Sequence, residues 1–244
     1  MNILCLADLH GHLPVDIPSQ HADVVVIAGD VCRDYSGYTR YENADIQLRW
    51  LRTQFHDWVV RVVRRPVIMT WGNHDFVAEA FSREEIEHAL DLRREDAVMQ
   101  WDPHVVILTD GECAVYRDRY EDRTVRFAGT PWSTLFGSWA FMREDHDLDE
   151  KYAQIPEHVD VLLAHGPPYG YGCRTRDGRA TGSRSLVRHL HRVQPRYVVC
   201  GHIHEARGTY PFSDTTVINA AYLNESYRPH VEDEYNPKYR IINV

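Results

Sequence analysis

The sequence predicts an α/β or a layered α/β/β/α fold, and three observations favour this class. Short apolar runs rich in Val, Ile and Leu alternate with helical stretches along the chain, as they do where strands and helices pack in layers. Apart from Asp23, the run at residues 22–28 is apolar, so we expect a strand buried on both faces. The chain has 244 residues, and compact α/β units commonly reach about 250 residues as one piece. We therefore expect residues 1–244 to form a single domain.

The elements of the first half follow from apolar runs and from helix signals. Apolar residues at helical spacing predict a helix over residues 44–63, which Pro66 ends. Ser82 and Glu85 form a capping box, so a second helix is expected from 82 to about 94. The strands expected in this half are 2–7, 22–28 and 67–71.

The middle of the chain changes character. Residues 104–108, 113–117 and 125–128 are short apolar runs separated by turn residues such as Asp110-Gly111, which predicts an antiparallel meander. Alternation of strand and helix then resumes. The remaining expected elements are strands at 159–164, 196–200 and 215–220 and a helix at 183–193.

The composition excludes several classes of protein. Hydrophobic residues make up 43% and charged residues 26% of the chain, as in soluble globular proteins rather than disordered chains or coiled coils. No apolar run approaches the roughly 18–20 residues of a membrane span, so no membrane association is expected. The net charge of −9 disfavours a broad nucleic-acid-binding surface. Five scattered cysteines, and a first strand that leaves no room for a signal peptide, predict a cytoplasmic location.

Five polar clusters each follow an expected strand. The carboxyl ends of strands border the ligand crevice in α/β sheets, so all five clusters are expected to converge on one site. The clusters are Asp8-Leu9-His10, Gly29-Asp30, Gly72-Asn73-His74-Asp75, His165-Gly166 and Gly201-His202-Ile203-His204.

Together the clusters supply a mixed set of oxygen and nitrogen ligands. Two carboxylates, one amide and four imidazoles suit Mn²⁺, Fe or Zn²⁺ better than Ca²⁺, which prefers an all-oxygen shell. Such a set exceeds the needs of one metal but fits two metals about 3.5–4 Å apart with one bridging carboxylate. The glycines before Asp30, Asn73 and His202 are expected to permit the tight turns that expose these ligands. The candidate metal ligands are Asp8, His10, Asp30, Asn73, His165, His202 and His204.

In this order the motifs resemble those of the calcineurin-like binuclear metallophosphoesterases, and the match spans residues 8–204. Further stretches are similar to one branch, the metallophosphoesterase-domain-containing (brain protein 239-like) group. Animal members of that branch carry Gly where this chain keeps His202, so the resemblance implies full activity here. It also implies a four-layer sandwich of two mixed sheets flanked by helices. The stretches are Gly129-Thr130-Pro131-Trp132, Gly137-Ser138-Trp139-Ala140-Phe141, His165-Gly166-Pro167-Pro168, Gly201-His202-Ile203-His204-Glu205 and Ile218-Asn219-Ala220.

The resemblance implies a role for each residue as well. His74 would face the substrate and stabilise or protonate the leaving group, and Asp75 would orient it. The reaction would be attack of a hydroxide that bridges two divalent transition metals, Mn²⁺ being the expected one. The first metal would be held by Asp8, His10, Asp30 and His204, and the second by Asp30 as the bridge, Asn73, His165 and His202.

Four more side chains are candidates for substrate contact. Trp132 belongs to an aromatic segment and could stack on a nucleobase, with packing in the core as the alternative. Arg174 and Arg176 lie in a Gly- and Arg-rich loop, residues 174–184, and could bind a phosphate or be solvated. His12, two residues past His10, could face the substrate or belong to a surface loop.

We therefore expect a two-metal phosphodiesterase that acts on a small diester such as a cyclic nucleotide. One alternative is a manganese-dependent nuclease that cuts single-stranded DNA or RNA, and another is a phosphomonoesterase or protein phosphatase. An alternative of a different class is a non-catalytic scaffold with the same fold. Scaffolds of this kind usually lose metal ligands, and none is missing here.

Overall fold

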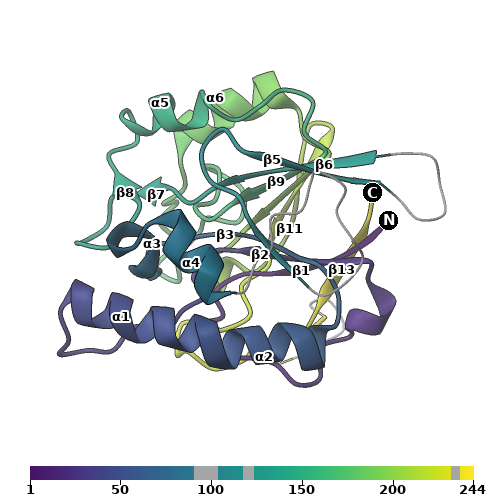
Figure 1. The fold of residues 1–244 in the computed structure, drawn as a ribbon. Helices are drawn as coiled ribbons and strands as arrows, with labels where there is room; N and C mark the ends of the chain where they lie inside the picture. The colour runs from purple at the N-terminus through teal and green to yellow at the C-terminus, as the bar shows by residue number, and fades with distance from the viewer. Residues whose placement is uncertain (91–103, 118–123, 232–236) are drawn as a thin grey trace.

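The computed structural model describes residues 1–90, 104–117, 124–231 and 237–244. Two mixed β-sheets face each other, and helices cover the outer side of each sheet, with α1 and α2 on one side and α5 and α6 on the other (Figure 1). The predicted four-layer α/β/β/α sandwich is confirmed. No helix among the described residues is both long and apolar enough to cross a membrane.

The first sheet carries the N-terminal strands. Its order is β13-β1-β2-β3-β4, parallel except for β13, which runs antiparallel to β1. All of β2 is buried, as expected: Val25 and Ile27 face the core beneath the helices, and Val24 and Val26 face the core between the sheets. The strands are β1 (Asn2–Leu6), β2 (Val24–Ala28), β3 (Val67–Thr70), β4 (Val105–Ile107) and β13 (Arg240–Asn243).

The second sheet is parallel at its centre and antiparallel at both edges. Its order is β11-β12-β10-β9-β6-β5, and the edge strands β11 and β5 run antiparallel to their neighbours. A small parallel pair, β7 with β8, lies apart from it. The strands are β5 (Cys113–Arg117), β6 (Thr124–Thr130), β7 (Ser133–Thr134), β8 (Met142–Arg143), β9 (Val161–Ala164), β10 (Tyr197–Cys200), β11 (Gly208–Phe212) and β12 (Thr215–Asn219).

The expected antiparallel meander is wrong for its first strand. β5 and β6 do form an antiparallel hairpin, but β4 pairs in parallel with β3 in the other sheet. An apolar run identifies a strand without identifying its partner, and the short distance in sequence between 104–108 and 113–117 favoured the local pairing. Strands β11 and β13 were not expected either.

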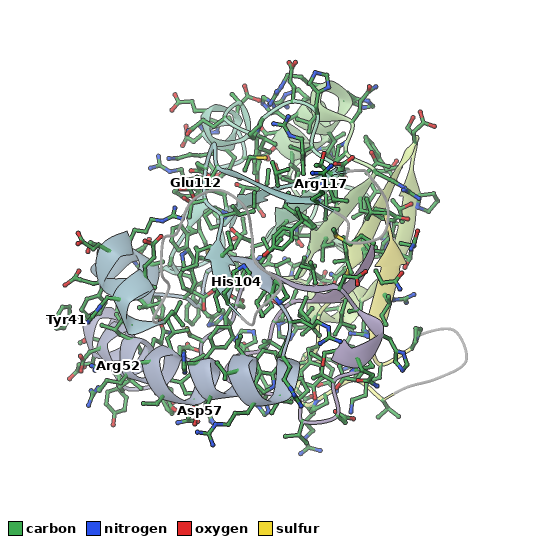
Figure 2. The ribbon with its side chains drawn as sticks, turned by 45° about the vertical axis from the view of Figure 1, so that its right-hand side comes forward. Tyr41, Arg52, Asp57, His104, Glu112 and Arg117 are labelled. Carbon is green, nitrogen blue, oxygen red and sulfur yellow. The ribbon has the colours of Figure 1, made fainter. Side chains whose placement is uncertain are left out.

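A long helical segment covers the first sheet. It starts at α1 (Arg40–Trp50), where Thr39 and Glu42 form a capping box, four residues before the predicted start. It continues through π-helical turns and ends at Arg64, whose backbone is left-handed. Figure 2 shows Arg52 and Asp57 on its outward face. The later parts of the segment are η2 (Leu51–Phe55), α2 (His56–Trp58) and η3 (Val59–Val63).

The remaining helices are short. The capping box of Ser82 and Glu85 is confirmed at the start of α4, and the predicted residues 91–94 of this helix lie outside the described residues. Ser183 caps α6, whose extent matches the prediction. The helices are α3 (Val77–Ala80), α4 (Arg83–Ala89), α5 (Leu148–Tyr152) and α6 (Arg184–Val193), with single 3₁₀ turns at η1 (Ser19–His21) and η4 (His204–Ala206).

The two sheets meet at the carboxyl ends of their parallel strands. Ala7, just past β1, donates its N–H to the carbonyl of Ala220 at 3.0 Å and accepts the N–H of Tyr222 at 2.8 Å. Gly201, just past β10, donates to the carbonyl of His165, just past β9. These bonds bring the loops after β1, β9, β10 and β12 to one edge of the molecule.

Candidate metal centre

All seven predicted metal ligands lie at this shared edge, and they come from both sheets. Asp8, His10, Asp30 and Asn73 follow strands of the first sheet, whereas His165, His202 and His204 follow strands of the second. Two groups of predicted ligands have ligand atoms within 4.8 Å of one another: Asp8 with His10 and His204, and Asp8 with Asp30 and His165. A third group of this kind joins His10 to Asp34 and His74.

Asp30 belongs to the second of these groups and also lies close to the first. Its Oδ2 is 3.6 Å from Nε2 of His10 and 3.4 Å from Nε2 of His165, so one carboxylate oxygen faces an imidazole of each group. Its other oxygen accepts the backbone N–H of His74 at 2.8 Å. This is the position that a bridging ligand requires.

Four of these residues have left-handed backbone angles, although none is glycine. The φ values are 53° for Asp8, 42° for His10, 51° for Asp30 and 67° for His202. Such angles are uncommon for residues with a side chain and cluster at functional sites, where the surrounding structure enforces them. The backbone at the strand ends is therefore shaped to aim these side chains at one point.

Two glycines beside the ligands are needed for space rather than for an unusual φ. A Cβ added at Gly72 would overlap the Asp30 carboxylate, and one added at Gly201 would overlap the Asp8 carboxylate. Only Gly29 of the three predicted turn glycines has a positive φ, +86°. The expected role of tight turns is thus confirmed for Gly29 and corrected to close approach for the other two.

Backbone carbonyls fix the orientation of two of the imidazoles. Nδ1 of His165 donates to the Ala28 carbonyl at 3.0 Å, and Nδ1 of His204 donates to the Asn224 carbonyl at 3.0 Å. Each bond leaves Nε2 facing the centre of the site. Outer hydrogen bonds of this kind orient metal-binding histidines in general.

The inward-facing donor atoms crowd together. Nε2 of His10 and Nε2 of His204 are 3.2 Å apart, and Oδ1 of Asn73 lies 2.8 Å from both Nε2 of His165 and Nδ1 of His202. Lone pairs at such distances repel unless a proton or a cation lies between them. The donor set therefore fits two divalent metal ions held by nitrogen and oxygen ligands.

Charged pairs surround the centre in the metal-free protein. Burial opposes the charged form of His165, but the Asp30 and Asp8 carboxylates outweigh it and raise its pKa to about 9. Burial likewise opposes the charged form of His204, but the Asp8 carboxylate outweighs it and raises the pKa of His204 to about 9. Burial would also raise the pKa of Asp30, yet the nearby imidazoles, His165 foremost, hold it well below its usual range.

The other two imidazoles are neutral. Burial lowers the pKa of His10 to about 4 and, with help from the charge on His165, that of His202 to about 3. Neutral imidazole is the form that binds a metal, so these two rings need lose no proton on loading, whereas His165 and His204 must each release one.

His74 lies beside the metal ligands, but its partner is not the expected one. Nδ1 of His74 is 3.1 Å from Oδ1 of Asp34. The prediction that Asp75 orients His74 is wrong, because the Asp75 carboxylate accepts the backbone N–H groups of Val31, Cys32 and Gly72 instead. Burial and the Asp30 charge raise the pKa of Asp75 to about 6, against those three hydrogen bonds.

Asp34 and Gln47 were missed by the sequence reasoning. Burial opposes ionisation of Asp34, but His74 outweighs it and lowers the carboxyl pKa; the pKa of His74 is raised in turn, despite burial, by Asp30 and Asp34. Gln47, buried on α1, donates to the carbonyls of His74 at 2.7 Å and Arg33 at 3.2 Å. A usable signal existed for each: Asp34 shares a loop with Asp30, and Gln47 is a polar residue on the buried face of a helix.

A cavity of about 500 Å³ opens over the centre. Its floor includes Asp30, Asn73, His74, His202 and His204. The loop between β7 and β8 lines one side, and the loop at 174–184 together with Tyr227 lines another. The lining side chains outside the floor are Thr134, Leu135, Phe136, Trp139, Thr175, Arg179, Thr181, Ile203, Glu205, Glu225 and Tyr227.

None of the four predicted substrate-contact residues lines this cavity. Arg174 donates to the Gly178 carbonyl at 2.6 Å, Arg176 pairs with Glu225 at 3.4 Å, and His12 is exposed. Trp132 packs on the core of the second sheet, and its Nε1 donates to Asp110 at 2.7 Å. The aromatic segment does reach the cavity, but through Phe136 and Trp139 rather than Trp132.

Comparison with known proteins agrees with this geometry. The family model described as calcineurin-like phosphoesterase matches residues 1–206. Metallophosphoesterase domain-containing protein 1 of Homo sapiens is 28% identical over 246 residues, which cover 93% of this chain and 67% of that protein. One crystal structure superposes with a TM-score of 0.61 at 17% identity, covering 89% of each chain. TT1561 of Thermus thermophilus superposes with a TM-score of 0.52 at 13% identity, covering 89% of this chain and 88% of that one.

Proposed function

The chain belongs to the calcineurin-like phosphoesterase family of metal-dependent phosphate-ester hydrolases, and from that premise we propose that it is a phosphodiesterase of small nucleotide diesters such as cyclic nucleotides. One observation carries the proposal. The seven candidate ligands converge from two sheets, with His74 beside them on the cavity floor. A scaffold that had lost catalysis would have no need to keep this set.

Two divalent metals, when bound, would neutralise phosphate charge and lower the pKa of a water molecule. The remaining functions fall to the protein. Asp8, Asp30, Asn73 and the four imidazoles would hold the metals. His74 would donate a proton or hydrogen bond to the leaving oxygen through Nε2, because its Nδ1 faces Asp34. The Asp34 carboxylate would favour the charged imidazole that this role needs.

The walls of the cavity support a small diester over a long nucleic acid. Glu205 and Glu225 line the opening, and Arg179 is the one arginine among the described residues that line the cavity. A polyanion relies on several cationic contacts to its phosphates, which these side chains do not supply. An exposed aromatic wall also suits an ester with an organic group on each side of phosphorus better than a bare phosphomonoester. A single-strand nuclease and a phosphomonoesterase therefore stay as the alternatives to test.

We also propose that the protein is cytoplasmic and that its metal is Mn²⁺. All five cysteines are unpaired, which suits a reducing compartment. The mixed nitrogen and oxygen donors without a thiolate suit Mn²⁺, with Fe or Zn²⁺ as alternatives.

The test is a substrate panel with the purified protein. Cyclic nucleotides, single-stranded oligonucleotides and p-nitrophenyl phosphate are offered with Mn²⁺ and, separately, after chelation. We expect turnover of the cyclic nucleotides that disappears on chelation and in an Asp8→Ala variant. Faster turnover of oligonucleotides or of the monoester would replace the proposed substrate class, and no turnover of any ester would favour the scaffold.

A further inference from the structure

Two large apolar side chains are exposed at the rim of the cavity. Phe136 is 70% exposed and Leu135 is 49% exposed, and both line the cavity. They belong to the loop between β7 and β8, together with Trp139, which lines the cavity below them. We call Leu135, Phe136 and Trp139 the aromatic lip. Exposed apolar side chains that border a site commonly mark a binding surface.

The aromatic lip is held in a fixed position relative to the metal ligands. The loop closes on itself through the N–H of Leu135, which donates to the Arg143 carbonyl at 2.8 Å. Ala140 donates its N–H to the carbonyl of Asn73, a predicted ligand, at 3.0 Å. The ring of Trp139 lies 4.3 Å from that of His74, tilted by 36°. The lip is therefore attached to the catalytic floor at two points.

The facing loop is polar and is joined to the lip. Thr175, Arg179 and Thr181 line the cavity from the loop at 174–184, and the hydroxyl of Thr134 donates to the Thr181 carbonyl at 2.7 Å. The cavity thus has a floor of metal ligands, one apolar wall at the lip and one largely polar wall, to which Tyr227 adds a second exposed aromatic ring. Only a ligand with an anionic group and a flat apolar group beside it matches all three surfaces.

We propose that the aromatic lip seats the nucleobase of the substrate, with Phe136 as the residue that selects for it. This inference rests on the proposed function and adds which part of the diester the enzyme recognises. Stacking on an aromatic side chain tolerates any base, because every base has a π-face. The expected specificity is therefore for nucleotides over alkyl diesters, with little preference among the bases.

The kinetic test compares two phosphodiesters that differ in the base. Cyclic AMP carries one, and glycerophosphocholine does not. In Phe136→Ala, the ratio of kcat/KM for cyclic AMP to that for glycerophosphocholine should fall about 5–150-fold. This is the range that stacking of a base on one aromatic side chain covers. Most of the change should come from a higher KM for cyclic AMP. Phe136→Tyr keeps a flat ring and should restore most of the ratio. An equal effect on both substrates, or no effect on either, would overturn the inference.

Tyr41→Ala is the matched control. Tyr41 is an aromatic residue with 69% exposure that does not line the cavity, and Figure 2 shows it at the outer edge of the molecule. Its truncation should leave the ratio unchanged. Both truncated side chains are exposed, so neither variant should lose thermal stability.

A binding experiment keeps this inference separate from the proposed function. The Kd of AMP and of ribose 5-phosphate is measured calorimetrically for the Mn²⁺-loaded protein and for Phe136→Ala. We expect the Kd of AMP to rise about 5–150-fold in Phe136→Ala and the Kd of ribose 5-phosphate to change far less. If the protein hydrolyses neither diester, the proposed function fails while the binding result still decides the inference. Equal weakening of both ligands, or of neither, would show that the lip does not seat the base.

Discussion

Asp8, His10, Asp30 and His202 hold backbone angles that an ordinary residue rarely adopts, and each costs on the order of 1–3 kcal/mol. The strain persists because the strands that precede these positions and buried hydrogen bonds hold the backbone in place. His202, for instance, donates its N–H to the Asp8 carboxylate at 2.9 Å. Substituting any of these residues therefore removes a ligand and also changes the local backbone preference.

The first prediction distinguishes the role of His74 in turnover from the role of the ligands in metal binding. His74→Ala should lower turnover of a diester with a poor leaving group by about 10²–10⁴-fold, the usual contribution of a general acid, with both metals still bound. Asp8→Ala and His202→Ala should lose metal. Elemental analysis of the three purified variants, beside their kinetics, checks this. An empty metal site in His74→Ala would contradict the role given to His74.

The second prediction separates Asp34 from Asp75. Asp34→Asn removes the charge beside Nδ1 of His74 and should lower kcat by about 10–100-fold with metal content unchanged, as loss of an orienting partner does. Because Asp34 raises the pKa of His74, the variant should also move the basic limb of the pH–rate profile, where His74 loses its proton, to lower pH. A variant with the wild-type pH profile and wild-type kcat would show that Asp34 does not act through His74.

Asp75→Asn should behave differently from Asp34→Asn. It would replace one carboxylate oxygen by an NH₂ group, although the carboxylate accepts the backbone N–H groups of Val31, Cys32 and Gly72. Buried hydrogen bonds to a charged group contribute about 1.5–3 kcal/mol each. We therefore expect a lower Tm, measured by thermal melting, and a proportional loss of activity through unfolding. A stable Asp75→Asn protein with low kcat would restore the orienting role that the sequence suggested.

At the scale of elements, the sequence predicts best what depends on local pattern. β2 and the capping box of Ser82 and Glu85 were predicted because an apolar run or a Ser-x-x-Glu spacing is complete within a few residues, whereas the similar box of Thr39 and Glu42 was missed. Convergence of the polar clusters was also predictable, because parallel strands place their carboxyl ends at one edge. The π-helical turns after Trp50 have no comparable signal.

Pairing between distant segments could not be predicted in the same way. β4 joins β3 rather than the nearby β5, and β13 pairs with β1 across nearly the whole chain. Asn224, whose carbonyl orients His204, lies in a loop without strand or helix periodicity. Trp132 was chosen because it is near the site in sequence, but the side chain turns toward the core while Trp139, seven residues later, reaches His74.

The third prediction concerns Trp132 as part of the β6–β7 connection. Its ring packs against the core of the second sheet and lies beneath Lys151 at 4.6 Å and Arg143 at 5.1 Å. Trp132→Ala should therefore destabilise the fold by about 3 kcal/mol, the low end for truncating a large aromatic because this ring is partly exposed. Thermal melting measures the loss, and activity toward base-bearing and alkyl diesters should fall together. A selective rise in KM for nucleotides at unchanged Tm would make Trp132 a substrate contact.

At the scale of the whole molecule, the site lies where the two sheets meet. The first sheet supplies Asp8, His10, Asp30 and Asn73, and the second supplies the other imidazoles. Residues beyond the span of the family model complete the surroundings, since Tyr227 packs edge-on against His10 at 4.9 Å and His204 at 5.5 Å. Metal ions bound here would link the two halves of the sandwich.

This arrangement makes the stability of the whole domain depend on metal. A ligand that binds only the folded state stabilises it by about 2.7 kcal/mol per site at one hundred times its Kd. In a chain of this size each kcal/mol raises Tm by about 2–4 °C. We therefore expect saturating Mn²⁺ to raise Tm by about 5–10 °C for each site filled. His74→Ala should keep this shift and Asp30→Asn should lose most of it.

The rise in Tm that Mn²⁺ causes should also grow with pH, because His165 and His204 must lose protons when metal binds. In the metal-free protein their raised pKa values, about 9, mean that both carry protons at neutral pH. Their pairing with Asp30 and Asp8 stabilises the fold fully below the ordinary histidine pKa of about 6.5 and progressively less as the pH rises toward about 9. Metal binding must displace these protons, so protons compete with metal more strongly at low pH. The Mn²⁺-induced rise in Tm should thus be larger at about pH 8 than at about pH 6.5, while the metal-free Tm should fall over the same interval. A metal-induced shift that is the same at both pH values would mean that His165 and His204 are already neutral before the metal binds.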